Sequence, residues 1–320
     1  MKKFLLFSLL LFIVLPPAFA AKERKPFFPA DNSADRMDAY EQEADKEKRT
    51  AEKRRFKQLR SEVRNGYTDS LMDLALAYYR GNGVKKNYKK AYKYMQKAAQ
   101  NGNALAAVLQ ANWLSRGKGV PQNLPLACEL LQELVQNQNP HAAFQLYTLG
   151  KQNHCGLTET NTQQLLDFAA EKGVAPALFE KSQNSQSPQE SFTFMERAAR
   201  LEYRLAQYEL ARMYKNGTGT DTNPAKAFDY MMLAAKQKLK EAQWQTAQWY
   251  EQGYGVKQSP SLAFHWTRIA AKNNVKDAQK RLAEMYRTGY GVPVNIGAAR
   301  KWEKKADAAS KNEETEEEFY

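Results

Sequence analysis

The chain has 320 residues, and 43% of them are hydrophobic, which is enough to bury a core and excludes wholesale disorder. Its 48 Lys and Arg exceed its 35 Asp and Glu, giving a formal net charge of +13 that favours anionic partners. Three His and two Cys exclude a zinc-finger array, an iron–sulfur protein and a disulfide-dense scaffold. The length predicts two domains or one extended array.

The first 20 residues have the pattern of a cleaved signal peptide. Two lysines precede an apolar run over residues 4–15, and Ala18-Phe19-Ala20 supplies the small-residue cleavage site before Ala21. At 1.5 Å per residue the run reaches about 18 Å, whereas a bilayer core is about 30 Å thick, which argues against an uncleaved anchor. No other stretch has membrane-spanning length. We expect export to a Gram-negative periplasm, cleavage between Ala20 and Ala21, and no stable membrane span.

Two segments precede the main body of the chain. Residues 21–33 are polar and contain prolines, which predicts a flexible linker. Residues 34–64 are crowded with charge and nearly free of β-branched side chains, which predicts a helix capped by Asn32 or Ser33. Residues 46–64 hold nine basic and three acidic side chains. Two interpretations remain open: a basic docking arm for an anionic partner, or a solvated helix that caps the array that follows.

Residues 65–308 contain a repeated pattern in which neighbouring complete copies are 36 residues apart. Each complete copy has a Gly-x-Gly turn, followed by an Asn or Ser suited to cap a helix. The glycine pairs are Gly81/Gly83, Gly117/Gly119, Gly217/Gly219, Gly253/Gly255 and Gly289/Gly291, and the caps are Asn87, Asn123, Asn223, Ser259 and Asn295. Small and large apolar residues four, seven and eleven positions after each cap form one helix face. A second helix pattern precedes each glycine pair, so every copy is predicted to be a helix hairpin.

Two further copies, without the glycine pair, fit between Gly117 and Gly217. Thr158 and Ser187 are expected to cap their second helices, because small apolar residues follow each of them in the same register. The complete set then contains seven helix pairs, and only the fourth is shortened, in its inter-helix loop.

This pattern resembles the Sel-one-like repeat family, relatives of tetratricopeptide repeats that stack helix hairpins into a right-handed superhelix. The resemblance rests on Leu74-Ala75, Tyr78, Gly81-Asn82-Gly83-Val84, Ala91, Tyr94, Ala98-Ala99 and Gly102, and on their counterparts in later copies. It implies an all-α, right-handed solenoid of seven tetratricopeptide-like hairpins over residues 65–308, the third and fourth degenerate. The family's common role implies a non-enzymatic scaffold or adaptor that binds protein partners on a concave surface lined by first helices.

The two cysteines fall in neighbouring copies. Cys128 lies early in the second helix of the second copy, and Cys155 lies in the turn of the third copy, at the position where other copies carry a valine. Antiparallel neighbouring helices bring both to the same end, so a disulfide worth about 3 kcal/mol is expected in an oxidising compartment. Two buried thiols are the alternative. A catalytic Cys would need an activating base, and the adjacency of His154 in a turn does not set that geometry.

No constellation of catalytic or metal-binding residues is found. His141, His154 and His265 lie in different copies and give no metal-ligand spacing. Hydrolase elbows, phosphate loops and zinc-protease motifs are absent from the sequence, and the Gly-x-Gly pairs follow helices rather than dinucleotide-binding strands. We therefore expect no catalysis, no cofactor and no metal.

Five aromatic residues lie outside the repeat frame or at turn tips and are candidates for partner contact. They are Tyr79, Trp113, Trp249, Tyr254 and Tyr290. Packing between repeats is the alternative for each. Tyr254 and Tyr290 are the most suggestive, because a turn between glycines offers little core to fill.

The acidic tail, residues 309–320, is expected to be disordered. One hypothesis is that it folds back onto the N-terminal arm or onto a lysine cluster, and the other is that it only aids solubility. The cluster consists of Lys85, Lys86, Lys89, Lys90 and Lys93.

Three hypotheses of function follow. The first is a periplasmic protein–protein interaction scaffold whose partner belongs to the bacterial envelope. The second is a module that binds cell-wall glycan or exported anionic polysaccharide, favoured by the basic charge and by the family's role in polysaccharide export. The third is a β-lactam-binding protein or cell-wall-active hydrolase, known among relatives with a cysteine pair in most repeats. This chain lacks those pairs, so that activity is not carried over. An exported chain is not expected to bind nucleic acid.

Overall fold

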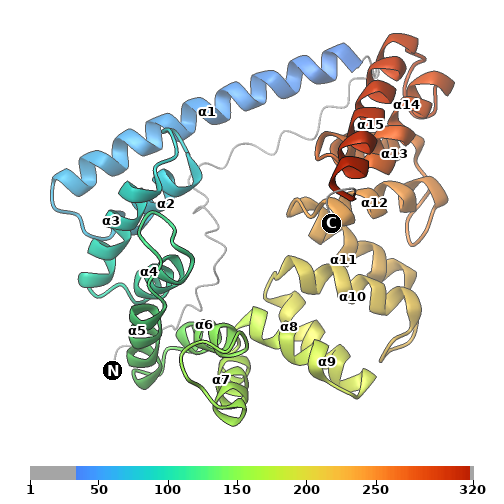
Figure 1. Cartoon of the computed structure of the whole chain (residues 1–320). Helices are drawn as coiled ribbons and strands as arrows, with labels where there is room; N and C mark the ends of the chain where they lie inside the picture. Colours follow the sequence, from blue (N-terminus) through green and yellow to red (C-terminus); the bar gives the residue numbers. More distant parts are fainter. Residues whose placement is uncertain (1–33, 318–320) are drawn as a thin grey trace, which may run out of the picture. The chain divides into compact units, whose positions relative to one another are not determined.

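The computed structural model describes residues 34–317, all of whose regular elements are α-helices (Figure 1). The expected signal peptide and linker, residues 1–33, and the last three residues of the tail lie outside the described residues. None of the described helices is long and apolar enough to cross a membrane.

Two compact units divide the chain inside α8 (Ala175–Asn184). The N-terminal unit, Asp38–Ala177, contains α1 (Ala34–Arg64) from residue 38 onward, α2 (Ser70–Arg80), α3 (Tyr88–Gln100), α4 (Ala104–Arg116), α5 (Leu124–Gln136), α6 (Pro140–Gly150) and α7 (Glu159–Glu171). The C-terminal unit, Leu178–Tyr320, contains α9 (Pro188–Arg200), α10 (Arg204–Asn216), α11 (Pro224–Lys236), α12 (Lys240–Gln252), α13 (Pro260–Lys272), α14 (Lys276–Thr288) and α15 (Ile296–Glu317). Helices α2 to α15 form the seven predicted pairs, each with a first and a second helix.

All seven second helices begin at the predicted caps. In each case a side-chain oxygen of the cap accepts a hydrogen bond from a backbone N–H of the first turn, with donor–acceptor distances between 2.9 and 3.4 Å. The caps are Asn87, Asn123, Thr158, Ser187, Asn223, Ser259 and Asn295. The capping prediction is therefore confirmed, including in the two copies that lack the glycine pair. Each cap contributes about 1 kcal/mol to helix stability.

The second glycine of each Gly-x-Gly turn lies against the backbone of the preceding second helix. A Cβ atom on Gly255 would lie 2.0 Å from the carbonyl oxygen of Pro224, and one on Gly291 would lie 2.1 Å from that of Pro260. Real Cβ atoms do not come so close to a carbonyl oxygen, so only glycine allows this approach. The turns therefore seat each helix pair directly on the backbone of the pair before it.

An aromatic contact accompanies each approach in the C-terminal unit. Phe228 of α11 packs edge-to-face on Tyr250 of α12, with ring centroids 5.0 Å apart, and Phe264 of α13 packs in the same way on Tyr286 of α14 at 5.3 Å. These rings fill the space between helices that approach closely through small side chains, such as the fully buried Ala227. Successive pairs therefore stack through one repeated contact.

The second half of α1 occupies the place of a second helix. A Cβ atom on Gly83 would lie 2.3 Å from the carbonyl oxygen of Glu52, and Phe56 packs edge-to-face on Tyr78 with centroids 5.3 Å apart. Residues 52–64 therefore form half of a further repeat, which supports the capping interpretation of this segment. The described side chains of α1 before Glu52 are exposed, and this part of the helix extends past α2 and α3 (Figure 1).

Helix α15 continues to Glu317, so residues 309–317 are helical where the sequence analysis expects disorder. The physical reason is local. No Gly or Pro follows Gly297, and Ala, Glu and Lys are strong helix formers that extend an already packed helix. The tail side chains that the fold-back hypothesis invokes lie outside the described residues.

Candidate functional site

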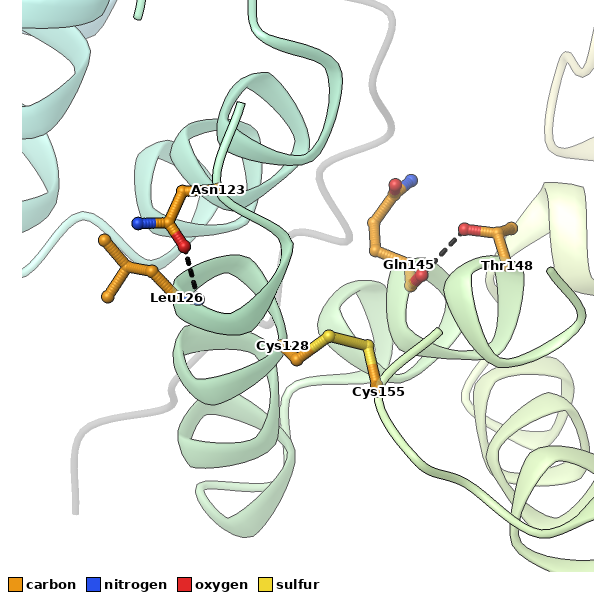
Figure 2. The surroundings of a disulfide bond; sticks show 6 residues. All are labelled: Asn123, Leu126, Cys128, Gln145, Thr148 and Cys155. Atoms are coloured by element: carbon orange, nitrogen blue, oxygen red, sulfur yellow. Dashed lines mark hydrogen bonds between the residues drawn. A yellow bond between two sulfur atoms is a disulfide. The ribbon is translucent and has the colours of Figure 1, made fainter. Parts of the chain in front are cut away.

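A disulfide joins Cys128 of α5 to Cys155 in the turn between α6 and α7 (Figure 2), with the two Cα atoms 5.4 Å apart. Both sulfurs are committed to this bond, so neither is a nucleophile. The bond links the second helix pair to the third. It lies where the fifth and sixth pairs make their glycine and aromatic contacts, because Cys128 occupies the position that Phe228 holds in α11.

The turn of the third pair has left-handed residues at the two positions of the glycine pair, but neither of these residues is glycine. Asn153 and Cys155 have φ angles of +60° and +69°, and Gly253 and Gly255 of the sixth pair have φ angles of +73° and +68°. Cys155 therefore takes the place of the second glycine, not that of the valine after it, which corrects the position expected from the sequence. Counting back from the cap Thr158 misplaces Cys155, because this turn is one residue shorter than the others.

The five aromatic candidates for partner contact divide into two groups. Trp113 and Trp249 are 4% and 1% exposed, so they pack between repeats and are removed as contact residues. Tyr79 stacks on Trp113 with centroids 4.8 Å apart, and Tyr254 rests on Trp249 at 4.9 Å. Tyr290 lies under the guanidinium of Arg281 at 5.4 Å, and the three tyrosines remain partly exposed.

A groove of about 530 Å³ lies between the first helices α12 and α14 of the C-terminal unit. Helix α12 contributes Trp244, Gln248, Glu251 and Gln252, and helix α14 contributes Asp277, Lys280, Arg281 and Glu284. All of these residues are partly or fully exposed. The lining residues of the groove are polar or charged except for one large aromatic residue, Trp244.

Arg281 is held in place by two carboxylates. Its guanidinium forms an ion pair with Glu251 across the groove and another with Glu284 of its own helix at 2.6 Å. Burial by itself would lower the pKa of Arg281, but the hydrogen bonds to Glu251 and Glu284 more than offset it and raise the pKa, so the side chain stays charged. The cluster links α12 to α14 across the groove.

Three side chains around this cluster remain available for a ligand. Trp244 is partly buried against the core of the last two pairs, and its remaining surface lines the groove. Asp277 and Lys280 are exposed, and neither forms an ion pair with any residue that the structure describes. An aromatic surface beside one free anion and one free cation suits a short polypeptide segment.

No motif in the sequence predicts this groove. The position of Trp244 holds Tyr208 in α10 and Lys280 in α14, so the residue type at this position does not repeat.

The described residues include no group of three His, Cys, Asp or Glu side chains that could hold a metal ion. His141 lies in α6, His154 in the following turn and His265 in α13. Burial lowers the pKa of His141.

The model of the Sel1 repeat family matches six segments that together cover more than half of the chain. They are residues 68–103, 104–137, 184–203, 204–239, 240–275 and 276–306. The unmatched stretch between them contains α6 and α7, where Asn153 and Cys155 replace the glycine pair.

Solved structures of repeat proteins resemble this chain. A Sel1 repeat protein from Oxalobacter formigenes is 25% identical, with 79% of this chain and 76% of that chain covered and a TM-score of 0.54. The protective antigen c5321 of uropathogenic Escherichia coli, which displays an SLR fold, is 22% identical, with coverages of 84% and 68% and a TM-score of 0.41. The immunity protein Pa5087 of Pseudomonas aeruginosa is 21% identical, with coverages of 63% and 75% and a TM-score of 0.48. None of the curated proteins matches this sequence.

Proposed function

The chain belongs to the Sel1 repeat family, and from this premise we propose that it is a periplasmic scaffold that binds a segment of an envelope protein between α12 and α14. Sel1 repeat proteins generally mediate protein–protein interaction, and this scaffold is generally non-enzymatic. The proposal assigns no reaction to this chain. Hydrolysis of a β-lactam by the purified protein would contradict that part of it.

The observation that carries the proposal is the groove with Trp244, Asp277 and Lys280 at its surface. Tryptophan is enriched among the side chains that contribute most to binding energy, and free charges beside it select the partner. The Arg281 cluster holds both walls before any partner arrives, so little conformational entropy is lost on binding. A rigid groove between two repeats suits an extended polypeptide segment.

Two features support the periplasmic location. Residues 1–20 have the signal-peptide pattern, and the bond between Cys128 and Cys155 suits an oxidising compartment. We expect the mature protein to begin at Ala21 and to be released by osmotic shock. A cytoplasmic protein that retains residue 1 and reacts with thiol reagents in cells would contradict this location.

Site-specific photocrosslinking tests the groove. A crosslinking amino acid at Gln248, inside the groove, is expected to capture one envelope protein, whereas the same amino acid at the exposed Lys236 of α11 is not. The purified partner should bind the variant Lys280→Glu about tenfold more weakly than the unchanged chain, because a matched charge becomes a repulsion. Lys236→Glu, with the same change of charge outside the groove, is the control. Equal capture from both positions, or equal loss of affinity in both variants, would refute the groove as the binding site.

Binding of cell-wall glycan or exported anionic polysaccharide is the second candidate function, and the formal net charge of +13 favours it. The two functions respond differently to salt. Retention of a purified glycan that is lost at high salt and is unaffected by Lys280→Glu would replace the scaffold proposal with this one.

A further inference from the structure

A second groove lies in the N-terminal unit, between the second half of α1 and the first helix pair. Its volume is about 340 Å³. It is lined by Lys57, Arg60, Ser61, Val63 and Arg64 of α1, Leu74 of α2 and Tyr94 of α3. We call it the basic groove, because its three charged side chains are all cationic.

The cations of the basic groove have no carboxylate partner among the described residues. Lys57, Arg60 and Arg64 are exposed and form no ion pair within that part of the chain. The neighbouring carboxylate, Glu62, accepts a hydrogen bond from Ser70 at 2.5 Å and is engaged on the side of α1 that meets α2. Three cations around one hollow repel one another until an anion lies between them.

The floor of the basic groove is apolar and fixed. Leu74 is 1% exposed, Val63 is partly buried, and the ring of Tyr94 is stacked on that of Tyr78 with centroids 5.8 Å apart. A purely polyanionic ligand would make no use of this floor. A peptide that carries an apolar side chain between carboxylates would use both the floor and the rim.

The chain contains its own comparison for this groove, in α9, α10 and α11. The contacts that shape the groove recur there: Phe192 packs edge-to-face on Tyr214 at 5.4 Å, and Tyr214 stacks on Tyr230 at 5.9 Å. Two of the three positive charges do not recur, because the positions of Lys57, Arg60 and Arg64 hold a threonine, a glutamate and an arginine. These counterparts are Thr193, Glu196 and Arg200.

Glu196 and Arg200 form an ion pair at 3.0 Å, so the counterpart on α9 neutralises itself. The wider surroundings differ in the same way. Residues 52–64 hold six basic and two acidic side chains and residues 85–100 hold six basic and none acidic. Their counterparts, residues 188–200 and 221–236, each hold two of both kinds. The repeat fold therefore does not require the positive charge of the basic groove.

We propose that the basic groove binds an acidic peptide segment of a partner protein, with carboxylates between Lys57, Arg60 and Arg64 and an apolar or aromatic side chain over Leu74 and Tyr94. This surface is formed by α1, α2 and α3, and the groove of the proposed function is formed by α12 and α14. Loss of binding at one therefore leaves the other unaffected, and the two proposals fail separately.

The test exchanges the charged residues of α1 in the basic groove with the residues at the corresponding positions of α9. The variant Lys57→Thr/Arg60→Glu gives α1 the side chains of α9, including a Glu four residues before an Arg, so the helix keeps an arrangement already present in the chain. The probe is a fluorescent synthetic peptide of glutamates interrupted by phenylalanine, and binding is followed by anisotropy. The exchange is expected to weaken binding by about tenfold and to reduce its salt dependence.

The reciprocal variant, Thr193→Lys/Glu196→Arg, is expected to create a second binding site for the same probe on α9. Circular dichroism of both variants verifies that the helices are retained. Unchanged affinity in the first variant would overturn the proposal, because the groove charges would then not be used.

A probe in which serine replaces phenylalanine separates a peptide from a general polyanion. The proposal expects this probe to bind about tenfold more weakly, since it leaves the apolar floor uncovered. Equal affinity of the two probes, together with equal competition by dextran sulfate, would overturn the peptide in favour of an anionic polymer.

Discussion

The turns of the third and sixth helix pairs have left-handed residues at the same two positions, by different means. In the sixth pair, Gly253 and Gly255 adopt left-handed conformations without cost, and Gly255 lies on the carbonyl oxygen of Pro224. In the third pair, Asn153 and Cys155 adopt the same conformations, which are unfavourable for residues with a Cβ atom. The stacking of the repeats therefore requires a left-handed backbone at these two positions, whichever residues occupy them.

The difference lies in what holds each turn to the preceding pair. The sixth pair uses a close backbone contact and the edge-to-face contact between Phe228 and Tyr250. The third pair has Gly150 at the position of that tyrosine and Cys128 at the position of that phenylalanine, and it has a covalent bond instead. Noncovalent packing in the sixth pair and a disulfide in the third pair therefore have the same role, which is to hold the turn to the preceding pair.

The largest effect is expected where the backbone contact is closest. Gly255→Ala places a Cβ atom against the carbonyl oxygen of Pro224 at a φ angle of +68°, and we expect a loss of stability of about 4 kcal/mol from overpacking and backbone strain together. Gly156→Ala is the matched control, because its φ angle is +62° and no atom lies within 4 Å of the added Cβ. It should cost about 1 kcal/mol. Hydrogen exchange of α12 and α13 in the full chain measures the first loss, and that of α6 and α7 the second. If the two variants lose equal stability, glycine is required at residue 255 by its left-handed conformation and not by the close contact with Pro224.

Removal of the disulfide is expected to have the next largest effect. The variant Cys128→Ser/Cys155→Ser should destabilise the junction of the second and third pairs by about 3 kcal/mol, because it frees a loop in the unfolded chain. Urea unfolding followed by hydrogen exchange should show the loss in α5 to α7 and leave α10 to α14 unchanged. A reducing agent should reproduce the loss in the unchanged chain and have no effect on the variant. Insensitivity to reduction would mean that the third turn is held by packing after all.

Helix caps should contribute equally to stability in the disulfide-linked third pair and in a pair with a glycine turn. Equal contributions would show that the two kinds of pair differ only in their turns. Thr158→Ala in the third pair and Asn223→Ala in the fifth pair each remove a side-chain acceptor from the first turn of a helix. Each should cost about 1 kcal/mol. Chemical denaturation of the two variants provides the measurement. A much smaller cost at Thr158 would show that the disulfide already holds the start of α7.

The smallest expected effect is a pH dependence confined to the third pair. Burial lowers the pKa of His141 below its ordinary value of 6.5, so the folded chain binds the proton less readily than the unfolded chain. The stability contribution of the neutral imidazole is fully present above pH 6.5 and is lost as the pH falls through the lowered value. Urea midpoints measured from about pH 7.5 to about pH 5 should fall more for the unchanged chain than for His141→Gln. Parallel curves would assign the acid sensitivity to other groups.

Local signals in the sequence predicted the pairs, whereas tertiary contacts decided the rest. Capping depends on a side chain and the N–H groups two or three residues later, so Thr158 and Ser187 could be assigned from the sequence even in degenerate copies. The half repeat in α1 has no such signal, because Ala51 stands where the other copies carry a cap. Its packing through Phe56 and Leu59 becomes visible only when α2 lies beside it.

The candidate site was harder to predict for a related reason. Trp249 and Trp244 are both tryptophans of α12, yet the first is buried between repeats and the second lines the groove. The residue type is the same, so only the helix face on which each tryptophan lies decides whether it is buried. The same holds for Cys155, whose place in the turn depends on a one-residue shortening that the backbone conformation reveals.

The seating of each glycine turn on the helix before it also bears on how such a chain changes over generations. Gly255 meets Pro224 and Gly291 meets Pro260 through the same contact. Deletion of residues 240–275 would bring Gly291 to Pro224 and recreate that contact, and duplication of the same segment would add one more. Unequal recombination between copies therefore lengthens or shortens this protein by whole helix pairs. Each product has a contact between neighbouring pairs that is already present in the parent protein.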